Sequence, residues 1–469
     1  MSSFRYLVQK SFRLVARKEY DEENGKFKYE IFPGHRQIGS NKDIITSYDK
    51  IILRDGANDS LFGPYSERAT MIRDELAQRI AASSGLPYQD FRPAVVYLNG
   101  QYYGILNIRE DFCQEYIQSQ YDIPSEDVVI ITNTYDRLGD GSIHFYYKVD
   151  DGTDEDVSGG LYLNDYSKMQ SFIINNNMAD NNLYNQASSM LDMENFYKYM
   201  AFEMYVCNTD WPHNNIEVWK TFGQTDSNVQ CQDGKWRYMF KDLDFAFARY
   251  SDKSAAPELY SRHDTNMFDY VFNDPYNDQL KISAMFKSLL NNDSFRINFV
   301  NYMCDLLNGV LSPQNAEAQM NLIKSQLQPE MLNDVNYWKT VQGQDIWSNL
   351  TQWDTAFETI SNFFDNRPVA MLSNMKSTTQ LKLTSYNKMT LQIEGSGTVI
   401  VNTVNVSDPS WTGTYFDNLP VVITAVPDSG YRFGGFIGTD GVKVSNVSST
   451  STNFIMTGDG TIKAVFTKN

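Results

Sequence analysis

Two short stretches decide how this chain is interpreted: NTDWPHNN at residues 208–215 and KDLDF at residues 241–245. The first places Asp210 five residues before Asn215, and the second places Asp242 two residues before Asp244. Carboxylate and amide oxygens are the ligands that Mg²⁺ and Mn²⁺ prefer, and these ions commonly accompany bound phosphates. The two stretches therefore predict a site for a phosphate-bound divalent cation.

The spacing matches the order of catalytic residues in phosphoryl-transfer enzymes of the protein-kinase type. In those enzymes an Asp accepts the proton of the attacking hydroxyl, an Asn five residues later holds one metal ion, and a later Asp holds another. Asp242 and Asp244 follow the alternating strand pattern of residues 235–240, and in an extended chain their carboxylates would point to the same face. Each residue alone is also a common turn or cap residue, so the prediction depends on their combination.

Composition and charge narrow the class of protein. A chain of 469 residues is expected to form more than one domain, and its net charge of -18 disfavours a nucleic-acid partner. Residues 381–469 hold six Lys or Arg and six Asp or Glu, so the acidic excess lies upstream, in the part that bears the motif. That excess either keeps the surface soluble or gathers carboxylates for divalent metal and basic substrates.

Several familiar features are missing from the sequence. It has no run of 18 apolar residues, so we expect no transmembrane segment, and residues 1–5 lack the apolar stretch of a signal peptide. Its four cysteines are widely spaced, which predicts buried thiols rather than structural zinc. Zinc-peptidase, serine-hydrolase and Walker motifs are absent, and so is the Gly-rich loop of ordinary protein kinases. His213, inside the first stretch, is either a neutral hydrogen-bond donor or simply solvated.

The pattern along the chain predicts an α+β fold in three parts. The first part is a small mixed lobe that ends at about residue 112. It contains a strand over 4–18 with a turn at 23–25, a helix over 68–83, and a hairpin of 94–98 with 102–106 around Asn99-Gly100. A larger helical lobe follows at about 113–375, and Thr, Val, Ser and Gly then dominate a separate all-β module at 380–469. Helices in the larger lobe are expected at 193–207, 278–290, 294–309, 312–327 and 353–365.

Several segments, taken in this order, resemble the CotH kinase family. They are QKSFRL at 9–14, IRDELA at 72–77, LNGQYYGI at 98–105 with Glu110, and the Asp210 and Asp242 stretches. The resemblance covers roughly residues 5–370. It implies an atypical protein-kinase-like fold of two lobes without the usual Gly-rich loop, together with phosphorylation of a protein that uses ATP and Mg²⁺ or Mn²⁺. We expect the acceptor to be a Ser or Thr of a surface or coat protein.

The resemblance also assigns roles to residues. Asp210 corresponds to the catalytic aspartate, and the metal ligands correspond to Asn215, Asp242 and Asp244. The residues assigned to the nucleotide are Lys10, Arg13, Glu75 and Glu110, of which Lys10 and Arg13 lie on the basic strand near the phosphates and Glu75 on a helix that pairs with such a base. The strand that usually precedes Lys10 is missing, and Val15 stands where many relatives have Lys, with Arg17 as its possible substitute. These departures imply a truncated or reshaped nucleotide site.

The tail resembles the divergent InlB B-repeat, a small β module of bacterial surface and secreted proteins. The resemblance is carried by GSGTV at 395–399, VITAVP at 422–427, GYRF at 430–433 and AVF at 464–466, and Phe436 stands where a tryptophan is usual. It implies an adhesive or spacer role and an extracellular or cell-surface location.

Two other functions remain open at this stage. In the first, the chain is a catalytically silent surface scaffold whose cleft and β module bind a polypeptide or glycan. The missing phosphate-cradling segment favours this alternative. Carbohydrate hydrolysis by paired acids is a third alternative, but no paired Glu arrangement recommends it.

Overall fold

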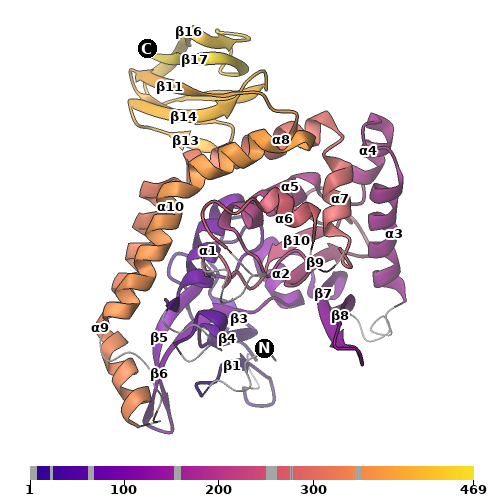
Figure 1. Cartoon of the computed structure of the whole chain (residues 1–469), viewed down its shortest axis with the longest axis vertical. Helices are drawn as coiled ribbons and strands as arrows, with labels where there is room; N and C mark the ends of the chain where they lie inside the picture. The colour runs from indigo at the N-terminus through magenta and orange to yellow at the C-terminus, as the bar shows by residue number, and fades with distance from the viewer. Residues whose placement is uncertain are drawn as a thin grey trace.

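The chain folds into a small lobe of sheet and helix, a larger lobe of helices around a second sheet, and an all-β domain at the carboxyl end (Figure 1). The computed structural model describes residues 8–21, 25–61, 68–152, 160–249, 261–274, 276, 278–341, 343 and 350–469. Mixed helix and strand content followed by an all-β domain confirms the α+β class expected from the sequence.

An antiparallel sheet in the order β1-β4-β6-β5 forms the small lobe. Its strands are β1 (Phe12–Val15), β4 (Lys50–Arg54), β5 (Phe91–Leu98) and β6 (Gln101–Glu110). Asn99 and Gly100 join β5 to β6 and both have positive φ, 51° and 79°, as a type I′ turn requires. The predicted hairpin is therefore confirmed. Helix α1 (Arg73–Ala81) lies within the predicted helix, and two-residue strands β2 (Phe27–Lys28) and β3 (Ser47–Tyr48) pair beside the sheet.

The first predicted strand is much shorter than expected. Residues 4–7 lie outside the described residues, and β1 ends at Val15 because the backbone turns, with the amide of Tyr20 donating to the carbonyl of Arg17. Of the predicted turn at 23–25, only Gly25 is described, and its φ is 57°.

A second antiparallel sheet, in the order β10-β9-β7-β8, forms the centre of the larger lobe. The sequence predicted a mostly helical lobe and missed three of these strands: β7 (Val128–Arg137), β8 (Ile143–Asp151) and β9 (Ile216–Thr221). Only β10 (Arg237–Phe240) was expected. The lobe's helices are α2 (Gln114–Tyr121), α3 (Leu161–Asn175), α4 (Asn181–Ser188), α5 (Met193–Val206), α6 (Met267–Phe272), α7 (Ile282–Leu289), α8 (Asp293–Asn308), α9 (Pro313–Thr340) and α10 (Thr351–Ser377).

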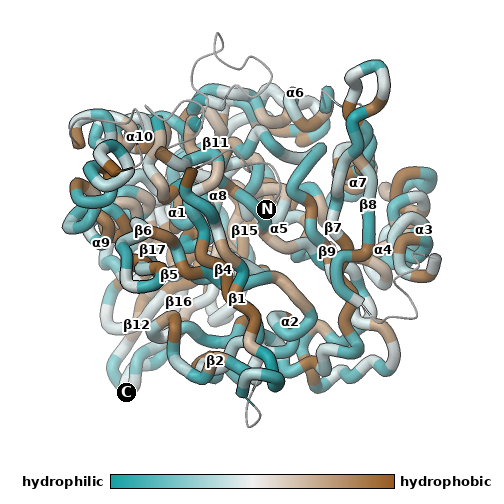
Figure 2. Tube along the Cα trace, turned by 90° about the horizontal axis from the view of Figure 1, so that it is seen from below, coloured by the Kyte–Doolittle hydropathy of each residue, from teal (hydrophilic) through white to brown (hydrophobic). Residues whose placement is uncertain are grey.

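Helix α5 is the centre of the hydrophobic core. All of its residues from 199 to 206 are buried, among them Met200, Phe202 and Met204, so the second half of the helix is enclosed on every side. Figure 2 shows hydrophobic residues along β4 near the middle of the outline. Because α5 is fixed on all sides, the loop that follows it starts from a rigid point.

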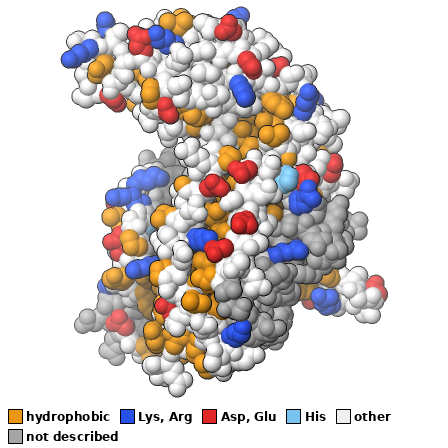
Figure 3. All heavy atoms as spheres, turned by 60° about the vertical axis from the view of Figure 1, so that its left-hand side comes forward, with side chains coloured by type: hydrophobic (Ala, Val, Ile, Leu, Met, Phe, Trp, Pro, Cys, Tyr) orange, Lys and Arg blue, Asp and Glu red, His pale blue; other side chains and the backbone are white. Residues whose placement is uncertain are grey.

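The carboxyl-terminal domain is a single sheet of strands in the order β13-β12-β15-β17-β11-β14, with β16 also paired to β17. Its strands are β11 (Tyr386–Glu394), β12 (Gly397–Val401), β13 (Val404–Val406), β14 (Ser410–Phe416), β15 (Val421–Pro427), β16 (Tyr431–Val444) and β17 (Ser451–Lys468). This confirms the predicted all-β module. In Figure 3 the surface is hollowed beneath this overhanging domain.

Buried polar contacts attach the β domain to α8. The carboxylate of Asp305 accepts hydrogen bonds from the hydroxyls of Tyr415 at 3.0 Å and Thr403 at 2.8 Å. Asn308 pairs with the backbone of Thr414 in both directions, at 2.9 Å each. These contacts hold the β domain in a defined orientation on the larger lobe.

Helices α9 and α10 run along one edge of the molecule, from the tip of the small lobe to the β domain (Figure 1). Among the described residues, no helix has both the length and the apolar composition that crossing a membrane requires.

Candidate active site

The loop after α5 carries Asp210 and is anchored at both sides. Cys207 ends the helix in the left-handed conformation, with φ of 59°, and the buried amide of Asn208 donates to Glu203 at 2.9 Å. The indole of Trp211, fully buried, donates to the hydroxyl of Tyr199 on α5 at 2.9 Å. The loop therefore holds Asp210 at a fixed place although it has no regular secondary structure.

Asp210 is held by side-chain amides from its own loop. Its Oδ2 accepts hydrogen bonds from the Nδ2 atoms of Asn215 at 2.9 Å and Asn214 at 3.1 Å, and 21% of its side chain is exposed. Burial and the negative charge of Asp242 together raise the pKa of Asp210 to about 7, against the effect of the two amides. Asp242 is thus near enough for its charge to act on Asp210. Near neutral pH this carboxyl group is therefore poised to accept a proton.

His213 belongs to the same loop but is not a charged partner of Asp210. Its Nε2 lies 3.8 Å from Oδ1 of Asp210, which is beyond hydrogen-bond distance. Burial lowers the pKa of His213 to about 4, so the imidazole is neutral at physiological pH. Its ring packs against Tyr276, with 4.3 Å between ring centroids.

The KDLDF stretch is not extended as the sequence suggested. Strand β10 ends at Phe240, and Asp242 adopts the left-handed conformation with φ of 50°. The expectation of an extended strand end is therefore wrong. The turn nevertheless brings both carboxylates to one guanidinium: Nη2 of Arg54 contacts Oδ1 of Asp242 and lies 3.2 Å from Oδ2 of Asp244.

The two carboxylates of this stretch have different surroundings. Asp244 is fully buried and accepts from the backbone amide of Asn58 at 2.9 Å, and burial with the nearby Asp242 charge raises the pKa of Asp244. The side chain of Asp242 is 28% exposed. Asp242 is therefore the better placed of the two to bind a cation, while Asp244 is fixed by the protein.

Arg54 on β4 and Asp74 on α1 complete the cluster, and the sequence interpretation missed both. Nη1 of Arg54 lies 3.3 Å from Oδ2 of Asp74, and Nη1 of Arg109 lies 2.7 Å from the same oxygen. The other oxygen of Asp74 accepts the backbone amide of Leu243 at 3.1 Å. Although burial opposes ionisation, Arg109 and Arg54 hold the pKa of Asp74 below its usual value. Asp74 thus links the small lobe directly to the KDLDF stretch.

The sequence contains a pattern that could have pointed to Asp74. Arg73, Asp74 and Glu75 are consecutive charged residues in a helix with apolar neighbours on both sides, and all three are buried. Buried charges are usually paired, so such a run predicts ionic partners elsewhere in the chain.

The four residues that the resemblance assigns to nucleotide binding do not lie together in the structure. Glu75 lies one position from Asp74 and accepts from Asn107 at 3.0 Å, and burial raises the pKa of Glu75 to about 7. Arg13 forms an ion pair with Asp111 at 2.7 Å. Its register partner is Ile52, so Arg13 lies on the same sheet face as Arg54.

Lys10 and Glu110, the other two residues assigned to the nucleotide, make their contacts outside the acidic cluster. The backbone amide of Lys10 donates to the hydroxyl of Tyr103 at 2.6 Å. Glu110 neighbours Arg109 on β6 and therefore points to the opposite face of the sheet, where it lies 3.1 Å from Nε2 of His35. The structure thus brings Glu75 to the acidic cluster and leaves Glu110 on the other side of the sheet.

The cluster contains more acidic than basic side chains, so it would carry excess negative charge if all of its acids were ionised. Its acids are Asp74, Glu75, Asp210, Asp242 and Asp244, and its bases are Arg54 and Arg109. In the described part of the chain, no three His, Cys, Asp or Glu side chains form a ready-made metal cluster. The donor set is nevertheless oxygen-rich, as Mg²⁺ and Mn²⁺ require, and an added cation would offset the excess charge. Asp242 and the amide oxygen of Asn215 are the residues that fit this role.

The fold and this site together define a protein-kinase-like class, in which the acidic cluster lies where the small lobe meets the larger one. More particularly, the chain belongs to the family described as CotH kinase protein, which matches residues 2–371. Residues 394–469 match the divergent InlB B-repeat domain. Both resemblances inferred from the sequence are thereby confirmed. No curated protein matches the chain.

Proposed function

We propose that this protein transfers a phosphoryl group from ATP to a Ser or Thr of another protein. The proposal rests on one arrangement: the charge of Asp242 acts on Asp210, which Asn215 holds, and Arg54 joins Asp242 to Asp244 and Asp74. When bound, ATP would supply the phosphoryl group, and Mg²⁺ or Mn²⁺ would neutralise charge on its phosphates. Membership of the CotH kinase protein family supports the same reaction.

Each residue of the cluster has a role in this proposal. Asp210 takes the proton of the acceptor hydroxyl, for which a pKa of about 7 is well matched to neutral pH. Asn215 orients Asp210 through its Nδ2 and offers its oxygen to the cation together with Asp242. Arg54, fixed by Asp74, adds positive charge at the same place, and buried Asp244 holds Arg54 from the other side.

The tail supports a proposal about location. Because residues 394–469 match a divergent InlB B-repeat domain, we propose that the protein works at the cell surface or outside the cell. Its acceptor would then be a surface or coat protein.

The test is the pair of variants Asp242→Asn and Asp440→Asn. Asp440 lies in the β domain, is exposed and, like Asp242, has positive φ, 55°, so it is a matched control. Calorimetry with Mn²⁺ and ATP should give saturable binding in the native chain and in Asp440→Asn, but binding weaker by at least tenfold in Asp242→Asn. Incorporation of labelled phosphate into protein should follow the same order. Equal nucleotide binding by all three proteins would contradict the assignment of Asp242.

A second candidate is a catalytically silent scaffold that binds a polypeptide or glycan. One observation favours it: Arg54 already provides a positive charge to Asp242, Asp244 and Asp74, so the cluster is partly neutralised without a metal ion. If calorimetry detects no heat at millimolar ATP with Mn²⁺, this candidate replaces the kinase.

A further inference from the structure

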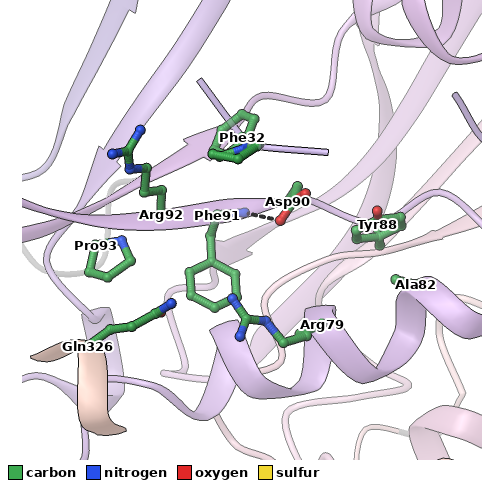
Figure 4. A pocket seen from close by; sticks show the side chains of 10 residues that line it. Phe32, Arg79, Ala82, Tyr88, Asp90, Phe91, Arg92, Pro93 and Gln326 are labelled. Atoms are coloured by element: carbon green, nitrogen blue, oxygen red, sulfur yellow. Dashed lines mark hydrogen bonds between the residues drawn. The ribbon is translucent and has the colours of Figure 1, made fainter. Parts of the chain in front are cut away.

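A second pocket, of about 580 Å³, lies beside α1 and away from the acidic cluster (Figure 4). Arg79, which lines it, follows Asp74 by five residues, so the two side chains leave the helix about 140° apart. The pocket is also lined by Asp90, Phe91, Arg92, Pro93 and Gln326. It has the size of a site for a small organic molecule.

The guanidinium of Arg79 is the unexplained group in this pocket. It lies 4.8 Å from the ring centroid of Phe91, and it makes no hydrogen bond or ion pair with any residue that the structure describes. Burial lowers the pKa of Arg79, because the charged form is partly removed from water. The charge of Asp90 only partly opposes this effect, and a half-buried cation that no carboxylate contacts directly is unfavourable, so a bound anion would reduce that cost.

Asp90 lines the pocket but is bound to other groups. Its Oδ1 accepts the backbone amide of Phe91 at 2.8 Å, and its Oδ2 lies 3.1 Å from Nδ1 of His35. Although burial opposes protonation, Glu110 and Asp90 raise the pKa of His35 to about 10, so this imidazole is positively charged. His35 is shared between Asp90 and Glu110, and Asp90 forms no ion pair with Arg79 within 4 Å, so the guanidinium of Arg79 can still contact a ligand.

The other side chains that line the pocket indicate the chemical character of the rest of the ligand. Figure 4 shows Arg79 rising from α1 beneath Phe91, with Gln326 of α9 pointing toward the same space, whereas Arg92 lies on the other side of the strand. Arg92 also donates to the carbonyl of Ile31 at 3.4 Å. The ligand thus meets the guanidinium of Arg79 and the amide of Gln326, next to the apolar surfaces of Phe91 and Pro93, while Arg92 lines the pocket from the other side of the strand.

We propose that this pocket binds a small monocarboxylic acid with an aromatic or aliphatic body. The planar guanidinium of Arg79 suits a carboxylate, which can accept two parallel N–H bonds and carries one charge. A phosphate dianion would leave one charge uncompensated. The apolar body would pack on Phe91 and Pro93, and the amide of Gln326 would donate to the carboxylate. This site is independent of phosphoryl transfer.

The experiment uses the full chain and three related probes: 3-phenylpropionate, phenyl phosphate and the neutral 3-phenylpropanol. Saturation-transfer NMR and calorimetry should show saturable binding of 3-phenylpropionate, at least tenfold tighter than that of the other two. Arg79→Gln should weaken this binding by at least tenfold, while Arg79→Lys retains part of it. Arg432→Gln, on an exposed arginine of the β domain, serves as the control and should leave binding unchanged.

Saturating ATP with Mn²⁺ should not displace 3-phenylpropionate, since the pocket and the acidic cluster are separate. Displacement by ATP, unchanged binding in Arg79→Gln, or equal binding of the neutral alcohol would each overturn the proposal. Tighter binding of phenyl phosphate would overturn the assigned ligand class. Circular dichroism and thermal unfolding of each variant distinguish loss of binding from loss of fold.

Discussion

Asp210 in the candidate active site and Asp305 at the junction with the β domain are both carboxyl groups whose pKa is raised to about 7. Their surroundings differ. Asp305 is buried and accepts hydrogen bonds from neutral donors, mainly Thr403 and Tyr415, so its pKa is raised by burial alone. Asp210 is partly exposed, and the negative charge of Asp242 adds to the effect of burial.

This difference teaches that a raised pKa does not by itself mark a catalytic group. Asp305 has donors on both oxygens and joins two domains. Asp210 has two amide donors on one oxygen and a second carboxylate nearby, so a cation or an acceptor hydroxyl still has a place beside it. The predictions below test this contrast, from the largest expected effect to the smallest.

Asp210→Asn should reduce phosphoryl transfer by about 100-fold to 10,000-fold, because an amide cannot accept the proton of the hydroxyl. Binding of Mn²⁺ with ATP should change by less than about threefold, because the cation is held mainly by Asp242 and Asn215. Asp305→Asn is the matched control and should leave transfer rates unchanged. Equal losses of transfer in both variants would remove the distinction between the two carboxyl groups.

Asp305→Ala should lower the free energy of unfolding by about 3 kcal/mol, because buried donors of Tyr415 and Thr403 lose their acceptor. Urea unfolding of the full chain measures this change. Asp210→Ala should cost less than about 1 kcal/mol, since it also removes the repulsion with Asp242. A larger loss of stability in Asp210→Ala than in Asp305→Ala would reverse the comparison.

The raised pKa of Asp305 also predicts how stability depends on pH. The folded state holds this proton more tightly than the unfolded state, in which the carboxyl returns to its ordinary pKa of 3.8. The associated stability is therefore complete below about pH 4 and is lost as pH rises toward 7, by roughly 4 kcal/mol at most. Asp305→Asn should flatten the stability curve over this range, as measured by urea unfolding between pH 4 and pH 8. Parallel curves for the two proteins would show that Asp305 does not titrate there.

Asn308→Ala should have the smallest effect, a loss of about 1 kcal/mol in unfolding free energy with no change in transfer. Its side chain makes two hydrogen bonds with the backbone of Thr414, and water can partly replace them at this half-exposed position. Thermal unfolding checks the change. A loss of transfer in this variant would mean that the junction acts on the active site.

Local patterns allowed part of the fold and of the candidate site to be predicted. The Asn99-Gly100 turn and the apolar run of α5 are encoded by neighbouring residues, so the hairpin and the helix were found. The spacing of Asp210 and Asn215, and that of Asp242 and Asp244, also involves residues close together in the chain, so both could be read from the sequence. In the structure the charge of Asp242 acts on Asp210, and Arg54 contacts both Asp242 and Asp244, while the roles assigned to these residues stay predictions.

The rest depends on contacts between residues that are distant in the chain. Arg54 meets Asp242 across 188 residues, and no periodicity reports such a pairing. Strand β7 begins with the short apolar run Val128–Ile131, which fits a buried helix as well as a strand. The turn at Asp242 was missed because Asp tolerates both extended and left-handed backbone, and only tertiary contacts select between them.

The parallel pairing of β11 with β17 determines how the β domain responds to mechanical force. Six register pairs, from Met389 with Gly460 to Glu394 with Val465, join the first strand of the domain to its last. A pull applied between α10 and the chain end would act along these two strands in opposite directions. The inter-strand hydrogen bonds would then share the load in shear instead of opening one after another like a zipper. The domain is therefore built to resist traction along the chain axis.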